Sequence, residues 1–187
     1  MRYFLGFLAA IGLIVLVFIL ILRGFSGNSN SPKRVAPLSD YATTNTVVQL
    51  TIDGPVVAED LHRGVRITVG GSENRLEIYQ GYQNNVIQSK TYANNEQAYG
   101  VFLRALQLAS FNKGNAEGPA DERGVCATGS RYIYEIIDGN TDVQRYWSTS
   151  CGGQGNFQGS PAPIRNLFSK QIPDYGPILS AYKVSFF

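Results

Sequence analysis

The sequence predicts an α+β protein, in which an N-terminal transmembrane helix is followed by an antiparallel β-sheet domain with helices packed on one face. Three observations lead to this prediction: an uncharged apolar stretch over residues 3–22, several segments that alternate apolar and polar residues, and a change to helical spacing after Tyr92. We expect a transmembrane anchor over residues 1–23, a flexible linker over residues 24–45 and a globular α+β domain over residues 46–187.

The apolar stretch from Tyr3 to Leu22 is long enough to cross a membrane. Its twenty residues extend about 30 Å as a helix, at about 1.5 Å per residue, which matches the hydrocarbon core of a bilayer. The stretch continues to Arg23 without an A-x-A cleavage pattern, so we expect an uncleaved, single-pass signal anchor. The linker that follows is rich in Gly, Ser, Asn and Pro and has no apolar period.

Four strands are predicted next, from alternation with a period of two residues. Turn-forming residues separate them at Asp53-Gly54-Pro55, at residues 70–74 and at Asn84-Asn85. Short turns between successive strands predict a meander. The apolar residues on the buried face of the first three strands are Val48, Leu50 and Ile52, then Val65, Ile67 and Val69, then Leu76 and Ile78, and the fourth strand covers residues 86–92.

The second half of the domain is predicted to mix helices and strands. Asn94 and Gln97 resemble a capping box, and Phe102 and Leu106 lie one turn apart on the apolar side of a helix over residues 95–110. Two strands flank Asp138-Gly139. A further helix begins at Ser160-Pro161 and is expected to end at Pro173, and residues 178–187 are expected to add an edge strand.

Cys126 and Cys151 are the only cysteines, and we expect them to form a disulfide. They are too few for a zinc site, because the single histidine, His62, is distant in the sequence. If Asp138-Gly139 is a two-residue type I′ turn, paired residues have numbers that sum to 277, as 126 and 151 do. The same register places one set of side chains on the cysteine face: Tyr132, Tyr134, Ile136, Val143 and Trp147. It places another set on the opposite face: Arg131, Glu135, Asp142 and Gln144.

The side of the membrane on which the domain lies is indicated by two opposing signals. Arg23, Lys33 and Arg34 outnumber Arg2, and the positive-inside rule would therefore keep the domain in the cytoplasm. A disulfide, in contrast, persists in an oxidising compartment. We give the disulfide more weight and predict that the domain lies outside the cytoplasm.

The charge balance argues against nucleic-acid binding. Arg2 and Arg23 account for two of the 16 basic residues, so the rest of the chain carries 14 basic and 14 acidic residues. A neutral domain lacks the excess of Lys and Arg with which proteins displace counterions from phosphates. We therefore expect the membrane, through residues 3–22, and a protein or glycan as partners, and no nucleic acid.

We predict no catalytic residue, cofactor or metal ligand. His62 lies in a polar segment, and no G-x-S-x-G motif supplies a nucleophile for it. The scattered carboxylates Glu59, Asp60, Glu73 and Glu77 are expected to be solvated. Residues 151–159 are rich in glycine but lack the Lys-Ser or Lys-Thr end of a phosphate-binding loop. They are either an ordinary connection or a recognition loop, in which Gly153, Asn156 and Phe157 would contact a partner.

Residues 1–7, MRYFLGF, followed by an apolar run, resemble a type IV pilin leader, in which cleavage would fall between Gly6 and Phe7. A pilin would have glutamate where Ile11 stands, and its helix would continue through residues 24–32. The chain also resembles uncharacterised single-pass membrane-anchored proteins of reduced-genome bacteria such as the Saccharibacteria, a likeness that carries no functional motif. We expect a non-enzymatic extracytoplasmic interaction module, with a pilin-like structural subunit or an enzyme of unfamiliar type as alternatives.

Overall fold

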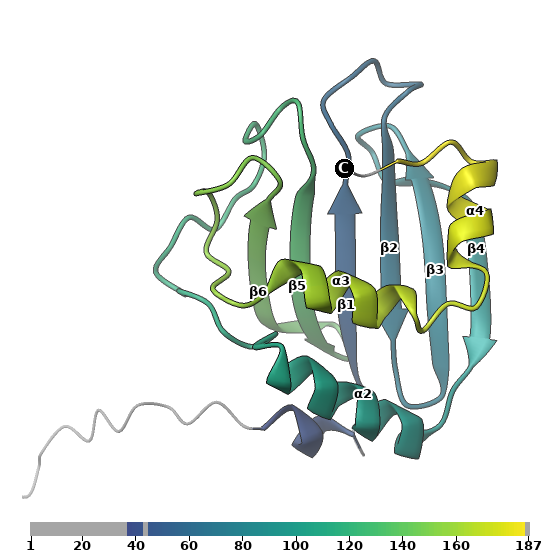
Figure 1. The fold of residues 1–187 in the computed structure, drawn as a ribbon, viewed down its shortest axis with the longest axis vertical. Coiled ribbons are helices and arrows are strands. Elements are labelled where there is room, and N and C mark those ends of the chain that lie inside the picture. The colour runs from purple at the N-terminus through teal and green to yellow at the C-terminus, as the bar shows by residue number, and fades with distance from the viewer. Residues whose placement is uncertain (1–36, 43–44, 186–187) are drawn as a thin grey trace, which may run out of the picture. The chain divides into compact units, whose positions relative to one another are not determined.

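The computed structural model describes residues 37–42 and 45–185 (Figure 1). This part of the chain has an α+β fold with one six-stranded sheet and three α-helices, as the sequence predicts. The elements in chain order are the 3₁₀ helix η1 (Leu38–Tyr41), β1 (Thr46–Asp53), β2 (Arg63–Val69), β3 (Glu73–Gln80), β4 (Asn85–Ala93), α2 (Glu96–Leu108), β5 (Arg131–Asp138), β6 (Thr141–Thr149), α3 (Pro161–Ser169) and α4 (Tyr175–Ala181).

The sheet is antiparallel, with the strand order β4-β3-β2-β1-β5-β6. The first four strands form the predicted meander. The chain then returns through α2, and the β5–β6 hairpin pairs with the other side of β1. Leu50 of β1 accordingly lies between Ile67 of β2 and Tyr134 of β5. The central strand therefore joins two segments that are far apart in the sequence.

The helices lie on one face of the sheet, where they cover the apolar residues of the strands (Figure 1). The N-terminus of α2 is capped by the Asn95 side chain, which accepts a hydrogen bond from the Ala98 amide. Phe102 and Leu106 are buried, as predicted from their spacing. The Phe102 ring meets the Phe168 ring of α3 edge to face, with the ring centres 5.2 Å apart. Among the described residues no helix lies on the opposite face of the sheet, which we call the open face.

The C-terminal edge strand predicted over residues 178–187 is wrong. Residues Tyr175–Ala181 form α4, with Asp174 at the N-cap position and Pro177 in the first turn, where a proline is tolerated in a helix. Ile178 and Val184 are buried in the core. The preceding helix, α3, ends at Ser169, before Pro173, which was expected to end it.

The folded domain begins before residue 46, the start predicted from the sequence. Leu38 in η1 is fully buried, and its amide donates to the Gln107 side chain of α2 at 3.0 Å. The predicted anchor over residues 1–23 and the linker as far as residue 36 lie outside the described residues. Within residues 37–42 and 45–185, none of the helices combines the length and the apolarity needed to cross a bilayer.

The register predicted for the β5–β6 hairpin is also wrong. Asp138 pairs with Thr141, so the turn is Gly139-Asn140, and a register shift between Ile136 and Ile137 adds a further residue. Paired numbers therefore sum to 279 beside the turn and to 280 beyond the shift. This register places Glu135 opposite Arg145, at 3.2 Å, instead of opposite an acidic residue.

The changed register also moves one large side chain to the other face of the sheet. Trp147 lies opposite Ile133 on the open face and not with Tyr132 and Tyr134, which remain in the core. The tryptophan is nevertheless buried, and its ring nitrogen donates to the Pro119 carbonyl at 2.6 Å. The loop between α2 and β5 therefore covers this part of the open face.

The predicted disulfide is present, but it lies outside the β5–β6 ladder. The sulfurs of Cys126 and Cys151 are 1.99 Å apart, and the bond joins the segment before β5 to the segment after β6. A Cβ atom at Gly129 would lie 2.6 Å from the Cys126 sulfur, so glycine is needed there for the bridge to pack. Closing a loop of 25 residues contributes about 3 kcal/mol in the chain-entropy description.

Candidate functional site

A cleft of about 340 Å³ lies on the open face of the sheet, near the end at which β1 enters the β1–β2 loop. Its lining includes Thr51 of β1, Ile133 of β5 and Tyr79 of β3, three side chains that are almost fully buried. The Tyr79 ring fits because Gly64 lies beneath it, where a Cβ atom would approach the ring carbons to 1.9 Å. Charged side chains from the strands and from the α2–β5 loop complete the cleft.

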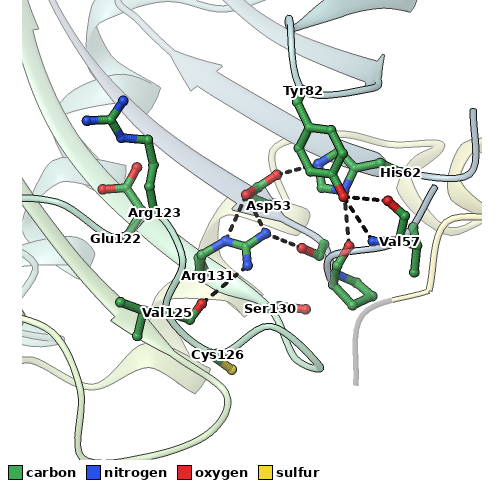
Figure 2. A network of polar contacts seen from close by, with 12 residues as sticks. Asp53, Val57, His62, Tyr82, Glu122, Arg123, Val125, Cys126, Ser130 and Arg131 are labelled. Carbon is green, nitrogen blue, oxygen red and sulfur yellow. Dashed lines mark hydrogen bonds and ion pairs between the residues drawn. The ribbon is translucent and has the colours of Figure 1, made fainter. Parts of the chain in front are cut away.

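A buried ionic network lies at the end of the cleft (Figure 2). Asp53, the last residue of β1, accepts a hydrogen bond from the Arg131 Nε at 2.8 Å and pairs with the Nη2 of the same guanidinium at 2.6 Å. Its other oxygen lies 2.8 Å from the His62 Nε2. Arg131 also donates to the carbonyls of Gly54 and Val125. The network therefore connects β1, the β1–β2 loop and β5.

His62 is held as a structural residue in this network. Its Nδ1 lies 3.0 Å from the Pro55 carbonyl and its Nε2 lies 2.8 Å from the Asp53 carboxylate, so both ring nitrogens are engaged within the fold. The side chain is 1% exposed, and its ring stacks on Tyr82 with the centres 4.2 Å apart. Neither nitrogen is available to take a proton from a substrate. The polar sequence around His62 indicated a loop but did not indicate this burial.

Asp53 also influences the neighbouring tyrosine. The Tyr79 hydroxyl lies 3.5 Å from the carboxylate. Burial, and then the negative charge of Asp53, raise the pKa of Tyr79 well above its usual range. Tyr79 is therefore a neutral hydroxyl in the cleft.

The two sides of the cleft are formed by further ion pairs. On one side, Arg66 of β2 lies 3.5 Å from Glu77 of β3. On the other, Arg145 of β6 lies 2.7 Å from Glu122 and 3.2 Å from Glu135. Burial lowers the pKa of Arg145, but its two acidic partners outweigh this effect and raise the value overall.

Arg123 extends toward the cleft from the α2–β5 loop and is paired with Asp121. Its guanidinium and backbone amide donate hydrogen bonds to the Asp121 carboxylate, which lower the pKa of that group to about 2. Both side chains are solvent-exposed, so the pair contributes little to stability.

Two polar atoms in the cleft have no hydrogen-bond partner among the described residues. They are the Arg66 Nε, a donor, and the Glu122 Oε2, an acceptor, and both are buried. Buried polar groups are nearly always paired in folded proteins. Each of the two atoms has essentially no solvent-accessible surface, so both are unsatisfied polar groups within the fold.

An exposed apolar surface adjoins the cleft, and we call it the loop tip. It consists of Val56, Val57 and Leu61 of the β1–β2 loop and Tyr82 of the β3–β4 turn, and Leu61 is 65% exposed. The Tyr82 hydroxyl bonds to both the amide and the carbonyl of Val57, as Figure 2 shows, and the Val56 amide donates to the Ala127 carbonyl. The loop tip is therefore held in place on both sides.

The predicted recognition loop is largely taken up by internal contacts. The Asn156 side chain is buried and accepts a hydrogen bond from the Trp147 amide at 2.8 Å. The Phe157 ring stacks on Tyr134 with the centres 4.0 Å apart. A contact role for these two residues thus has no support in the structure. Of the three residues predicted to contact a partner, Gly153 is the one that is exposed.

The predicted carboxylates do not form an acid–base pair. Glu77 takes part in the cleft through Arg66, whereas Glu73 pairs with Arg75 elsewhere on β3. Glu59 and Asp60 lie in the β1–β2 loop, where the Glu59 carboxylate accepts a hydrogen bond from the Tyr82 amide.

Arg66, Glu122 and Arg145 were not predicted as site residues from the sequence. The signal available was the polar half of each strand's alternation, because residues two apart, such as Arg66 and Thr68, share the open face. Glu122 carried no signal, since it lies in a loop whose return to the sheet is a tertiary feature.

A comparison with protein-family models and a search of curated proteins give no match for this chain. Within the described residues, no group of three or more His, Cys, Asp or Glu side chains is placed to hold a metal ion. A functional proposal therefore rests on the loop tip and the cleft.

Proposed function

We propose that this protein is a membrane-tethered, extracytoplasmic interaction module that binds a partner protein through its loop tip. The observation that carries the proposal is the exposure of four large apolar side chains on two loops that are held rigidly together. Apolar side chains that cluster on a well-ordered surface are typical of binding sites, because their burial in a complex is favourable and little order is lost on binding.

The position of the loop tip supports this role. The chain enters the domain at η1, next to the start of β1, and the loop tip follows the end of β1 (Figure 1). β1 has eight residues, which extend about 27 Å at about 3.4 Å per residue. The loop tip therefore lies at the opposite end of β1 from η1, where the described part of the chain begins.

The chemistry of the loop tip favours a protein as the partner. Its exposed groups are mostly aliphatic, with the carboxylates of Glu59 and Asp60 beside them. An apolar hollow with a basic rim would complement this surface in both shape and charge. Negatively charged lipid headgroups would be repelled by the two carboxylates.

The disulfide supports placement outside the cytoplasm. The bond between Cys126 and Cys151 is stable in an oxidising compartment and is rare in reducing ones. The segment that it fixes includes Ala127, whose carbonyl holds the Val56 amide of the loop tip. An oxidising location would therefore stabilise the proposed binding surface.

The test is site-specific photo-cross-linking of the full chain in intact cells that make it. A photo-reactive residue in place of Leu61 should give a discrete protein adduct, which Val57→Asp should abolish. The same residue in place of Leu108, an exposed leucine on α2, is the matched control and should give none. Equal adducts from both positions, or none from position 61, would contradict the proposal.

A further inference from the structure

We propose that β4, at one edge of the sheet, pairs with β4 of a second copy of this chain. The two sheets would then form one continuous antiparallel sheet around a twofold axis at Thr91. Backbone amides and carbonyls provide the contact, and the side chains set the register. This surface is separate from the loop tip, and the proposal does not depend on the partner proposed for that site.

The two edges of the sheet differ in what covers them. Beside β6, the amides of Asn156 and Phe157 donate to the Trp147 carbonyl, so a following segment lies along that edge. The outer edge of β4 has no backbone hydrogen bond to another segment of the described part of the chain (Figure 1). β4 has nine residues, no proline and a single charge, Lys90. A long, uncovered edge strand is a template for another strand.

The ladder between β3 and β4 shows which backbone groups point outward. The Asn94 amide donates to the Ser72 carbonyl at 2.8 Å, so these two residues occupy a hydrogen-bonded position of the ladder. Such positions alternate with positions at which both backbone groups point away from the neighbouring strand. Counting back from Asn94 without a register shift, the outward-pointing residues are Ser89, Thr91 and Ala93.

A twofold axis at Thr91 pairs all three of these residues. Thr91 faces Thr91 of the other copy, and Ser89 faces Ala93, so each outward-pointing residue meets another and exchanges two hydrogen bonds with it. The interface uses the same surface on both copies, as a twofold dimer requires. With the axis at Lys90 instead, Ala93 would face Ile87, where the register of β4 shifts, and two lysines would oppose each other.

The side chains favour the axis at Thr91. Lys90 then faces Tyr92 of the other copy, a half-buried ring against which the aliphatic part of the lysine packs. Two threonines directly opposite each other are a favourable pair in an antiparallel sheet. Lys90, the one charged residue of β4, therefore has no like charge opposite it.

The first half of β4 is unsuited to the same pairing. Ile87 is an extra residue at the register shift, and such a bulge bends the strand. The side chains of Gln88 and Lys90 are bonded to Tyr182 and Asp174 at the two ends of α4. All these contacts precede Thr91. The twofold axis therefore places the two bulges, and the two copies of α4, on opposite sides of the centre.

The first experiment uses the full chain in detergent, with single cysteines introduced on β4. The native cysteines are joined to each other and do not take part. Under mild oxidation, Thr91→Cys should form a disulfide-linked dimer, because the Cα atoms of a hydrogen-bonded pair lie about 5.5 Å apart, within the range for a disulfide. Ser89→Cys, at an equally exposed position, is the matched control. Its two copies would lie about 14 Å apart along the strands, so it should give no dimer.

A second experiment tests the backbone contact. Sedimentation of the chain without added cysteines should show a dimer whose fraction rises with concentration. Thr91→Pro removes an outward-pointing amide, which an edge strand tolerates, and it should abolish the dimer. Thr91→Val keeps the amide and should leave the dimer in place.

The proposal is wrong if the chain stays monomeric at every concentration, or if Thr91→Cys and Ser89→Cys cross-link equally well. It is also wrong if Thr91→Pro, with unchanged circular dichroism and melting temperature, still forms the dimer. Photo-cross-linking from position 61 reports on the loop tip alone, so the two proposals can fail separately.

Discussion

Replacing Asp53 with asparagine should remove much of the stability of the fold. The Arg131 side chain is only 4% exposed, and Asp53 is its ion-pair partner. The asparagine would keep the volume of the side chain, so no cavity forms, but the guanidinium would retain only carbonyl acceptors. Breaking a buried pair from one side costs about 3–5 kcal/mol, a large part of the roughly 5–15 kcal/mol that stabilises a domain.

Urea unfolding followed by circular dichroism measures this loss. With a slope of about 1–3 kcal/mol per molar, Asp53→Asn should lower the midpoint by about 1 M or more. Asp142→Asn is the matched control, because Asp142 is exposed on β6, and it should change stability by no more than about 0.5 kcal/mol. The double variant Asp53→Asn with Arg131→Met removes both charges and should be more stable than Asp53→Asn alone. The reasoning would be refuted if Asp53→Asn had the same urea midpoint as Asp142→Asn. It would also be refuted if the double variant lost as much stability as Asp53→Asn and Arg131→Met lose together.

Two further predictions concern the core. Leu106→Ala should destabilise the domain by about 2–5 kcal/mol in urea unfolding. Leu108→Ala, at a position 89% exposed on the same helix, should have little effect. Similar losses for the two variants would mean that the buried face of the helix is misassigned. Burial raises the pKa of Tyr134 to about 12, and the Ser148 hydroxyl offsets part of this rise, so the folded state holds the phenolic proton more tightly than the unfolded state. The resulting stability is complete below about pH 10 and is lost as the pH rises toward 12, by about 2–3 kcal/mol. Tyr134→Phe should show a shallower decline over this range, and an unchanged slope would contradict the assignment.

The strands and helices with regular apolar spacing were predictable from the sequence. Val48, Leu50 and Ile52 alternate along β1, and Phe102 and Leu106 recur at a helical interval in α2, because each element has one buried face. The order of the meander followed from short turns. After Asp174 the apolar spacing was too short a pattern to distinguish a helix from a strand. The start of α4 depends on Asp174 at the N-cap and on Pro177 in the first turn more than on apolar spacing.

The hairpin shows a limit of turn-based reasoning. Asp138-Gly139 is a favoured two-residue turn, yet the chain turns at Gly139-Asn140. The observed register pairs Glu135 with Arg145 and allows Trp147 to be covered by the α2–β5 loop. These two contacts favour the observed register more strongly than the turn preference favours the predicted one. A rule for turn residues does not include contacts with distant segments of the chain.

The cleft was not predictable, for a related reason. Arg66 and Glu122 belong to segments that meet only after β5 has paired with β1. Nor could His62 be placed, because a polar sequence context indicates a loop and does not tell whether that loop folds over a carboxylate. The pairing of the two cysteines, by contrast, needed no three-dimensional information, since the chain holds only two.

The central place of β1 in the sheet has a consequence for how the chain matures. β1 is made early, but one of its two hydrogen-bonding edges has no partner until β5 emerges, after the whole meander and α2. An open strand edge is prone to pair with other chains, and contacts between distant segments form slowly. Biosynthesis therefore exposes this edge in every nascent chain, and the cleft forms only when the last hairpin has docked against it.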